Sequence, residues 1–495
     1  MPIRRALLCL GLVLLPMMVA GETFEIKDPA PPEFVSLEKQ PPPLPQVFDQ
    51  LKFHASPRPL ASDAVVHEWP RFLGPTDNAK STESPLLNTW PERGPKLLWE
   101  VLKGDSYTSP SIAGDYLVLF HAMNGREIIE CLHRETGQRF WQMDYEIDYS
   151  DRYGYSNGPR GSPVITEDRD KVITLGVTSV LTCLDLATGR IVWQRDLRKE
   201  FQVPQEFFGH GSSPLIYEDK VIVNVGGKEP LVSVGAFDLQ TGKLVWGVLD
   251  EWGASYASPM LATLHGQTKL LVFAGGESKP ATGGLLCIDP KTGELHDRFP
   301  WRANDYISVN ATSPVLIPEK NRVFVSTCYP KRNPLGGVMV EYDSQFKGKE
   351  IWKSSEFGVH WMNPIYHEGH LYGIDGETDR LAKLVCYDAD TGEEKWRDSL
   401  SWQDQEMGGT LSIQRASLLL VDGKFLCLGE LGSLHELELT PEGCKVLQQT
   451  QLFYAPHTWC LPALSHGLFY VMQNYPEQVR KASGQRILCF DLRGE

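Results

Sequence analysis

Ten aromatic, histidine, amide and arginine residues stand at similar places along the chain, each shortly before a short apolar run. They are Tyr107, Asn157, Arg160, His210, Tyr256, Asn310, His360, Trp361, His457 and Trp459. Stacking rings, amides and a guanidinium are the groups with which proteins hold a polar ligand. They form a candidate ligand-binding set if the fold brings their loops together, and the alternative is that they cap and turn the chain around a water-filled channel.

The same regions hold no convincing catalytic set. Asp105, Glu251, Asp305 and Glu406 are carboxylates near these positions, but none belongs to a motif with a nucleophile or a base. No Cys-x-x-Cys or His-x-x-x-His spacing indicates a structural metal. We therefore assign no catalytic residue and no metal ligand from the sequence.

A repeat supplies the elements that would position the ten residues. A Ser-Pro step recurs with a period of roughly 50 residues, which is typical of propellers and other repeat folds. Its members are Ser109, Ser162, Ser213, Ser258 and Ser313, and Asn363-Pro364 keeps the proline in the same place. Each step is followed by short apolar runs, such as residues 221–223, that predict strands.

A second signal follows each step and predicts a hairpin. In one unit it consists of Cys183, Asp185, Thr188-Gly189 and Trp193. Asp and Thr side chains bond nearby backbone amides, and glycine takes the positive φ that the turn requires. The tryptophan recurs at one phase, which favours a packing role between neighbouring sheets over a role in holding a cofactor.

The units add up to a closed ring. Six are clear, a seventh runs from residue 409 to 449, and an eighth ends at residues 487–492 without its hairpin and tryptophan. A tryptophan without a preceding hairpin, Trp99, stands before the first unit. We therefore predict an all-β, eight-bladed β-propeller of four-stranded antiparallel blades, closed by an N-terminal strand around Trp99 that pairs with the strand of Cys489.

These units, together with residues 69–75, Trp-Pro-Arg-Phe-Leu-Gly-Pro, resemble the pyrroloquinoline-quinone-like (PQQ-like) propeller repeat proteins. That family is related in architecture to the quinoprotein alcohol dehydrogenases and to the propeller of the outer-membrane assembly machine. The resemblance covers roughly residues 69–495 and is specific for fold rather than function. Its dehydrogenase branch implies PQQ with calcium, for which the carboxylates above, with Asn157 and Asn310, are the available oxygen ligands.

The N-terminal residues predict export. Residues 1–21 combine Arg4 and Arg5 with an apolar run and are expected to be a signal peptide, with an uncleaved anchor as the alternative. Residues 22–68 are rich in proline and are expected to be a linker, with a docking peptide as the alternative. Residues 69–495 are expected to be the propeller. We place the protein in the periplasm or cell envelope.

The composition argues against one class of partner, and the positions of the cysteines predict their state. The net charge of −15 argues against a nucleic-acid partner. Five cysteines, among them Cys131 and Cys489, share one slot in different blades and are expected to be buried thiols, whereas pairing among Cys328, Cys427, Cys444 and Cys460 stays open.

We expect a monomeric, non-catalytic binding or assembly propeller without a cofactor. It would hold an envelope protein or a small polar ligand at its loop face. The alternatives are a PQQ- and calcium-dependent dehydrogenase of alcohols or sugars and another activity such as carbohydrate processing.

Overall fold

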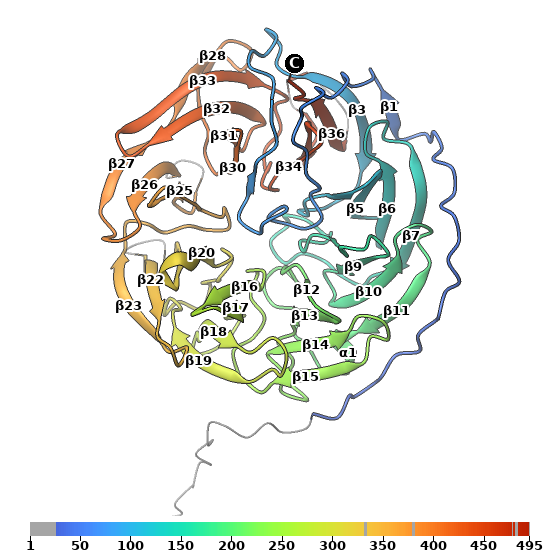
Figure 1. Ribbon diagram of the computed structural model, residues 1–495, viewed down its shortest axis with the longest axis vertical. Coiled ribbons are helices and arrows are strands. Elements are labelled where there is room, and N and C mark those ends of the chain that lie inside the picture. Colours follow the sequence, from blue (N-terminus) through green and yellow to red (C-terminus); the bar gives the residue numbers. More distant parts are fainter. Residues whose placement is uncertain (1–25, 331–333, 379–381, 478, 481–483, 495) are drawn as a thin grey trace, which may run out of the picture.

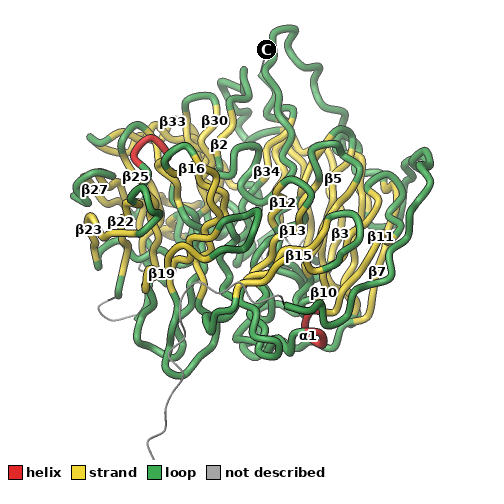
Figure 2. The backbone as a smooth tube through the Cα atoms, turned by 60° about the horizontal axis from the view of Figure 1, so that its bottom comes forward, coloured by secondary structure: helices red, strands yellow, loops and turns green. Residues whose placement is uncertain are grey.

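Eight antiparallel sheets lie side by side in a ring (Figure 1). The computed structural model describes residues 26–330, 334–378, 382–477, 479–480 and 484–494, and it confirms the predicted eight-bladed propeller. Helical structure in this part is limited to α1 (Leu197–Glu200) and a 3-10 turn at Pro318–Lys320, short pieces among the strands of Figure 2. None of the described helices is long and apolar enough to cross a membrane. The expected signal peptide lies outside the described residues.

The first four blades each consist of four consecutive strands. Blade 1 comprises β4 (Ser111–Ala113), β5 (Tyr116–Met123), β6 (Arg126–His133) and β7 (Arg139–Glu146). Blade 2 comprises β8 (Val164–Ile165), β9 (Lys171–Leu175), β10 (Val180–Asp185) and β11 (Ile191–Asp196). Blade 3 comprises β12 (Leu215–Tyr217), β13 (Lys220–Asn224), β14 (Val234–Asp238) and β15 (Leu244–Val248). Blade 4 comprises β16 (Met260–Leu264), β17 (Gln267–Ala274), β18 (Gly284–Ile288) and β19 (Leu295–Pro300).

Blades 5 and 6 also consist of four consecutive strands, whereas blades 7 and 8 include strands from the N-terminal part of the chain. Blade 5 comprises β20 (Val315–Ile317), β21 (Arg322–Thr327), β22 (Gly336–Tyr342) and β23 (Gly348–Ser354), and blade 6 comprises β24 (Ile365–His367), β25 (His370–Asp375), β26 (Lys383–Asp388) and β27 (Glu394–Asp398). A separate hairpin of β28 (Ser401–Asp404) and β29 (Gly409–Ser412) follows. Blade 7 joins β2 (Lys80–Ser81) to β30 (Ser417–Val421), β31 (Lys424–Leu428), β32 (Ser433–Thr440) and β33 (Gly443–Gln451). Blade 8 joins β34 (Ala463–Ser465), β35 (Leu468–Gln473) and β36 (Gln485–Asp491) to β3 (Lys96–Lys103) and β1 (Leu51–Phe53).

The ring closes as the sequence predicts. Strand β3 pairs antiparallel with β36, and Trp99 stands opposite Cys489. Strand β1 then pairs with the free edge of β3, placing Phe53 opposite Trp99. Blade 8 therefore has five strands, and its outer two come from the N-terminal part of the chain.

The Ser-Pro steps form a chain of hydrogen bonds around the channel. The backbone N–H of Ser109 donates to Oγ of Ser162 (2.9 Å), and Ser162 donates in the same way to Ser213 (2.9 Å). The series continues to Ser258 and Ser313 and ends at the side-chain oxygen of Asn363 (3.2 Å). Asn363 therefore replaces serine because its side chain supplies the same acceptor.

Each repeat tryptophan fastens its blade to the next one. The indole N–H of Trp193 in blade 2 donates to the Leu239 carbonyl in blade 3 (3.0 Å), and Trp99 in blade 8 donates to the Arg134 carbonyl in blade 1 (3.1 Å). Blade 4 has Asp297 at this position, and its carboxylate accepts a hydrogen bond from the Gly348 N–H of blade 5 (2.8 Å). These contacts confirm the packing role.

The repeat cysteines are buried inside the blades. Cys131, Cys183, Cys287, Cys386 and Cys489 are fully buried on third strands. All nine cysteines of the described residues carry free thiols, so Cys328, Cys427, Cys444 and Cys460 form no disulfide in this structure.

The proline-rich segment expected to be a linker follows the outer edge of the ring (Figure 1). The carboxylate of Asp28 pairs with the fully buried guanidinium of Arg195 on β11 (2.6 Å). Farther along, Gln46 exchanges backbone hydrogen bonds with Arg139 on β7. The described part of this segment therefore contacts blades 2, 1 and 8 in turn, while its boundaries as a domain stay a prediction.

Residues 69–81 then cross the central channel. Trp69 exchanges backbone hydrogen bonds with Ile112 on β4, and the Pro70 carbonyl accepts from Ile165 on β8 (2.9 Å). Strand β2 pairs in parallel with β30. Figure 1 shows this part of the chain in the middle of the ring, so we call residues 69–81 the channel segment.

Candidate functional site

A cavity of about 230 Å³ lies where the channel segment meets the loops that lead into the innermost strands. Residues from most of the blades line it, so the ring as a whole forms the cavity. Its side chains include Tyr107, Tyr155, Arg160, Phe208, Tyr256, Tyr329, His360, Trp361, Glu377, Arg415 and Trp459. Tyr329 and Glu377 follow second strands, so both sets of loops share this face, which we call the loop face.

Aromatic side chains from separate blades form a continuous belt around this cavity. The ring of Tyr155 lies 6.0 Å from Phe208 and 5.7 Å from Trp459, measured between centroids. Trp459 in turn lies 4.8 Å from Trp361 and 5.2 Å from Tyr107. Because these rings hold one another in place, the wall is organised before any ligand arrives.

Two arginines enter the belt, and each is held by a buried carboxylate. Nη2 of Arg160 donates to Asp151 (2.6 Å), and the guanidinium lies 5.8 Å from the ring of Tyr107. Nε of Arg415 donates to Glu430 (2.8 Å), and its guanidinium lies 4.7 Å from the ring of Trp459. Both cations therefore have a counter-charge and an aromatic face within the protein.

The channel segment forms one end of the cavity. Phe72 and Leu73 line it, and Leu73 is buried. Gly74 follows with a φ of +80°, and a Cβ there would lie 2.7 Å from the ring of Trp69. Glycine is therefore required at this turn, both for its backbone conformation and for its lack of a side chain.

Six of the ten residues predicted from the sequence line the cavity. They are Tyr107, Arg160, Tyr256, His360, Trp361 and Trp459. The repeat placed them correctly because each precedes an innermost strand, and those strands converge on the channel. Their binding role stays a prediction.

The other four predicted residues do not line the cavity. His210 lies between the hydroxyls of Ser179 and Ser212, and burial lowers its pKa to about 4. Asn310 is fully buried and donates to the Ala274 and Trp301 carbonyls. The protein itself therefore occupies His210 and the amide nitrogen of Asn310, whereas the amide oxygen of Asn310 is buried without a hydrogen-bond partner in the described part of the chain.

Asn157 and His457 support particular lining residues. Asn157 accepts a hydrogen bond from the backbone N–H of Asp151 (2.9 Å), the residue that holds Arg160. His457 stacks on Trp459 with 4.1 Å between centroids, and burial lowers its pKa. Both act on the cavity through their neighbours.

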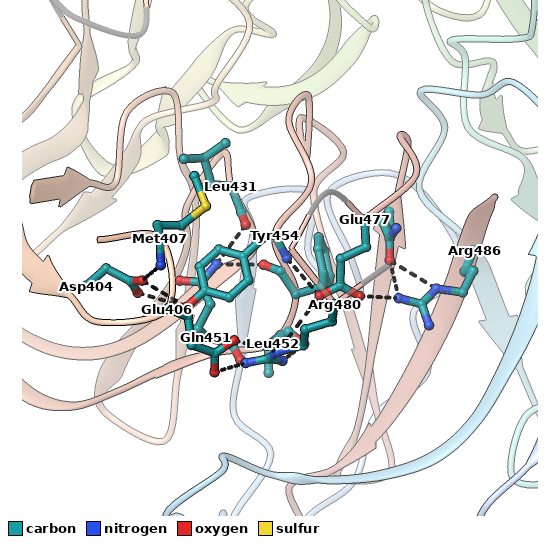
Figure 3. Close-up of polar contacts among 12 residues, drawn as sticks. Asp404, Glu406, Met407, Leu431, Gln451, Leu452, Tyr454, Glu477, Arg480 and Arg486 are labelled. Atoms are coloured by element: carbon teal, nitrogen blue, oxygen red, sulfur yellow. Dashed lines mark hydrogen bonds and ion pairs between the residues drawn. The ribbon is translucent and has the colours of Figure 1, made fainter. Parts of the chain in front are cut away.

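Glu406 and Met407 lie on the β28–β29 hairpin rather than in the cavity (Figure 3). The Glu406 carboxylate pairs with Arg480 (3.0 Å), and the Asp404 carboxylate accepts from the Tyr454 hydroxyl (2.9 Å). This hairpin is an insertion between blades 6 and 7, so the spacing of the repeat misplaces its residues.

Sequence reasoning missed Arg415, Tyr329 and the channel segment. Arg415 lies just before Ser417, which takes the Ser-Pro position of blade 7 without a proline. Ser417 could therefore have marked Arg415 as a residue that precedes an innermost strand. The pairing of residues 69–81 with inner strands has no local signal.

The carboxylates that calcium would require do not converge. Asp105 accepts from Gln485 (2.7 Å), Glu251 pairs with Arg298 (2.6 Å), and Asp305 accepts from the Ile307 N–H. The amide oxygen of Asn310 is buried without a hydrogen-bond partner, but the described residues contain no group of three His, Cys, Asp or Glu side chains able to hold a metal. The oxygen ligands proposed for a PQQ and calcium site therefore do not fit one.

Comparison with known protein families gives one match. The model of the family described as outer membrane protein assembly factor BamB matches residues 125–398, which is more than half of the chain. No curated protein sequence matches the chain.

Solved structures share the fold at low sequence identity. The crystal structure of BamB from Moraxella catarrhalis has 14% identity and a TM-score of 0.51, and the match covers 81% of this chain and 98% of that one. Quinohemoprotein alcohol dehydrogenase from Comamonas testosteroni has 13% identity and a TM-score of 0.57, with 86% and 81% covered. A europium-containing methanol dehydrogenase has 13% identity and a TM-score of 0.55, with 86% and 98% covered. These similarities support the propeller fold and do not separate an assembly factor from a dehydrogenase.

Proposed function

The chain belongs to the family of the outer membrane protein assembly factor BamB, and from this membership we propose that it is an exported, non-catalytic binding or assembly propeller of the bacterial cell envelope. It acts as a monomer, and its loop face holds an envelope protein or a small polar ligand. The observation that carries the proposal is the cavity at that face, walled by rings and carboxylate-held arginines from separate blades.

Exposed aromatic residues beside the cavity also support binding at the loop face. The ring of Tyr153 lies 5.3 Å from Phe208 in the cavity wall, and 53% of Tyr153 is exposed. Tyr306 contacts Phe207 (5.4 Å) and is also exposed. Exposed aromatic residues next to a preorganised cavity are typical of binding surfaces.

Affinity capture from envelope extracts tests the proposal with the intact exported chain. We expect the wild type to retain a protein or glycan component, and Tyr153→Ala to retain at least five-fold less. The matched control is Val245→Ala, which alters an equally exposed apolar residue on the outer strand β15. Equal loss with both variants, or capture that neither variant changes, would count against binding at the loop face.

The alternative function is a PQQ- and calcium-dependent dehydrogenase of alcohols or sugars. Addition of the quinone and calcium to the purified protein, followed by absorption spectra, thermal melting and dye reduction, distinguishes the two. We expect no turnover, because the candidate carboxylates are spread over separate blades and engaged in other contacts. Quinone binding with turnover would favour the dehydrogenase over the non-catalytic binding propeller.

A further inference from the structure

The size of the cavity limits its occupant to a small molecule. Its volume of about 230 Å³ is below the roughly 300–1,000 Å³ of sites for drug-sized ligands. It is several times the roughly 30 Å³ that one water occupies. The space therefore suits one six-membered ring with its substituents.

The charges around the cavity are already compensated. Arg160 pairs with Asp151, and Arg415 pairs with Glu430, whose side chain is 3% exposed. Glu377, the remaining charged lining residue, also has an interaction partner. A charged ligand would lose its hydration without gaining an unused counter-charge, so the cavity favours a neutral ligand.

Arg415 offers a hydrogen-bond donor beside the aromatic belt. Glu430 engages Nε and Nη2 of Arg415, which leaves Nη1 available for another acceptor. If the occupant offered no acceptor, this donor would lose its hydration without a new partner, at a cost of about 1–3 kcal/mol, so an occupant with oxygen acceptors is favoured over a purely apolar one.

We propose that the cavity binds one neutral saccharide ring, whose C–H faces lie against the aromatic belt and whose oxygens accept from Nη1 of Arg415. This inference rests on the proposed binding function and names the ligand class of the same site. No bond is made or broken. A free monosaccharide and the terminal ring of an envelope glycan share this chemistry.

Saturation-transfer NMR and calorimetry on the intact chain test the ligand class. The probe is methyl β-D-glucopyranoside, and inorganic phosphate and tetramethylammonium serve as charged probes at matched ionic strength. We expect the glucoside to bind with a Kd of about 1 mM or tighter, in keeping with its small size, with most saturation on its ring C–H groups. Cellobiose distinguishes a free monosaccharide from the terminal ring of a glycan. It should match the affinity of the glucoside only if the site accepts the end of a chain.

Matched variants locate the binding. Trp459→Phe makes one ring of the aromatic belt smaller, and Arg415→Lys keeps the charge beside Glu430 but removes the guanidinium fork. We expect each to weaken glucoside binding at least five-fold. Trp402→Phe is the control, because Trp402 packs against His435 on the β28–β29 hairpin outside the cavity. Tyr155→Ala, at a ring that is 42% exposed, replaces Trp459→Phe if that variant does not fold.

The outcomes separate the two proposals. Binding of phosphate or tetramethylammonium that Arg415→Lys or Trp459→Phe weakens, without glucoside binding, would overturn the saccharide assignment and leave the binding function standing. Glucoside binding that Trp402→Phe weakens as strongly as Trp459→Phe would also overturn it. Failure of every probe, together with capture insensitive to Tyr153→Ala, would count against both.

Discussion

At the residue scale, the ring depends on the contact between a tryptophan of one blade and the turn of the next. Trp193 is buried, and its indole N–H meets the Leu239 carbonyl of blade 3. The glycine of that turn, Gly242, lies against the face of the same ring, where a Cβ would be 2.6 Å away. The motif is therefore a pair of complementary parts carried by neighbouring repeats.

Replacing this tryptophan tests the contact. We expect Trp193→Phe to lower the free energy of unfolding by about 1–3 kcal/mol, because the Leu239 carbonyl loses its donor and a gap opens. Urea unfolding measures the change. Trp402→Phe, on the separate hairpin, should cost less than about 1 kcal/mol, and equal costs for the two variants would contradict the role of the contact.

A buried carboxyl group between blades 1 and 2 gives a pH prediction. Glu127 accepts from the Tyr145 hydroxyl (2.6 Å) and the Val177 N–H (2.8 Å), and burial raises its pKa from 4.5 to about 7. Between these two values the folded state holds a proton that the unfolded state has lost. The contribution of this group to stability therefore falls as pH rises from 4.5 to 7.

Glu127→Gln removes this titration. We expect the stability of the variant relative to the wild type to increase between pH 5 and pH 8, by on the order of 2–3 kcal/mol. Urea unfolding at the two pH values measures it. Glu146→Gln, at an exposed carboxylate on the same blade, should show no such change. A pH-independent difference for Glu127→Gln would contradict the assignment.

At the scale of elements, the channel segment depends on the turn at Gly74. We expect Gly74→Ala to destabilise the protein more than Gly125→Ala and to weaken ligand binding as well. Both glycines have positive φ, but a Cβ at position 74 would strike Trp69, whereas nothing lies within 4 Å at position 125. Gly125→Ala should therefore cost only about 1 kcal/mol for its backbone conformation. Unfolding and binding assays on both variants measure this, and equal effects would contradict the prediction.

The N-terminal segment contributes stability through one buried ion pair. We expect Asp28→Asn to cost about 2 kcal/mol, because the guanidinium of Arg195 is fully buried and would keep only Glu200 as a charged partner. Lys39 lies on the same segment and forms an exposed ion pair with Asp170 of blade 2. Lys39→Ala breaks this pair and should lower the free energy of unfolding by less than about 1 kcal/mol. Thermal melting of both variants compares them, and similar effects would show that the segment does not bind the ring through Arg195.

Elements with a periodic signal could be predicted from the sequence, including the closing strand around Trp99. The repeat reveals them because most blades use the same serine acceptor and the same tryptophan contact. The parallel pairing of Lys80 and Ser81 with β30 could not be predicted, because two residues hold no pattern. Arg415 was missed because its blade lacks the Ser-Pro step, and Glu406 was misplaced because an inserted hairpin interrupts the period.

At the scale of the whole molecule, the two ends of the chain complete both the ring and the cavity. The N-terminal part supplies the outer strands of blade 8, an edge of blade 7 and the end wall of the cavity. The loops of the other blades supply the aromatic belt. The same N-terminal part of the chain therefore contributes both to closure of the ring and to the wall of the cavity.

Hydrogen–deuterium exchange on the intact chain, with and without the bound sugar or the captured partner, tests the central claim most directly. We predict slower exchange on binding in loops 153–160, 207–211, 359–362 and 457–461, which surround the cavity. Slower exchange confined to the outer strands β15, β19 and β23 would contradict a binding site at the loop face.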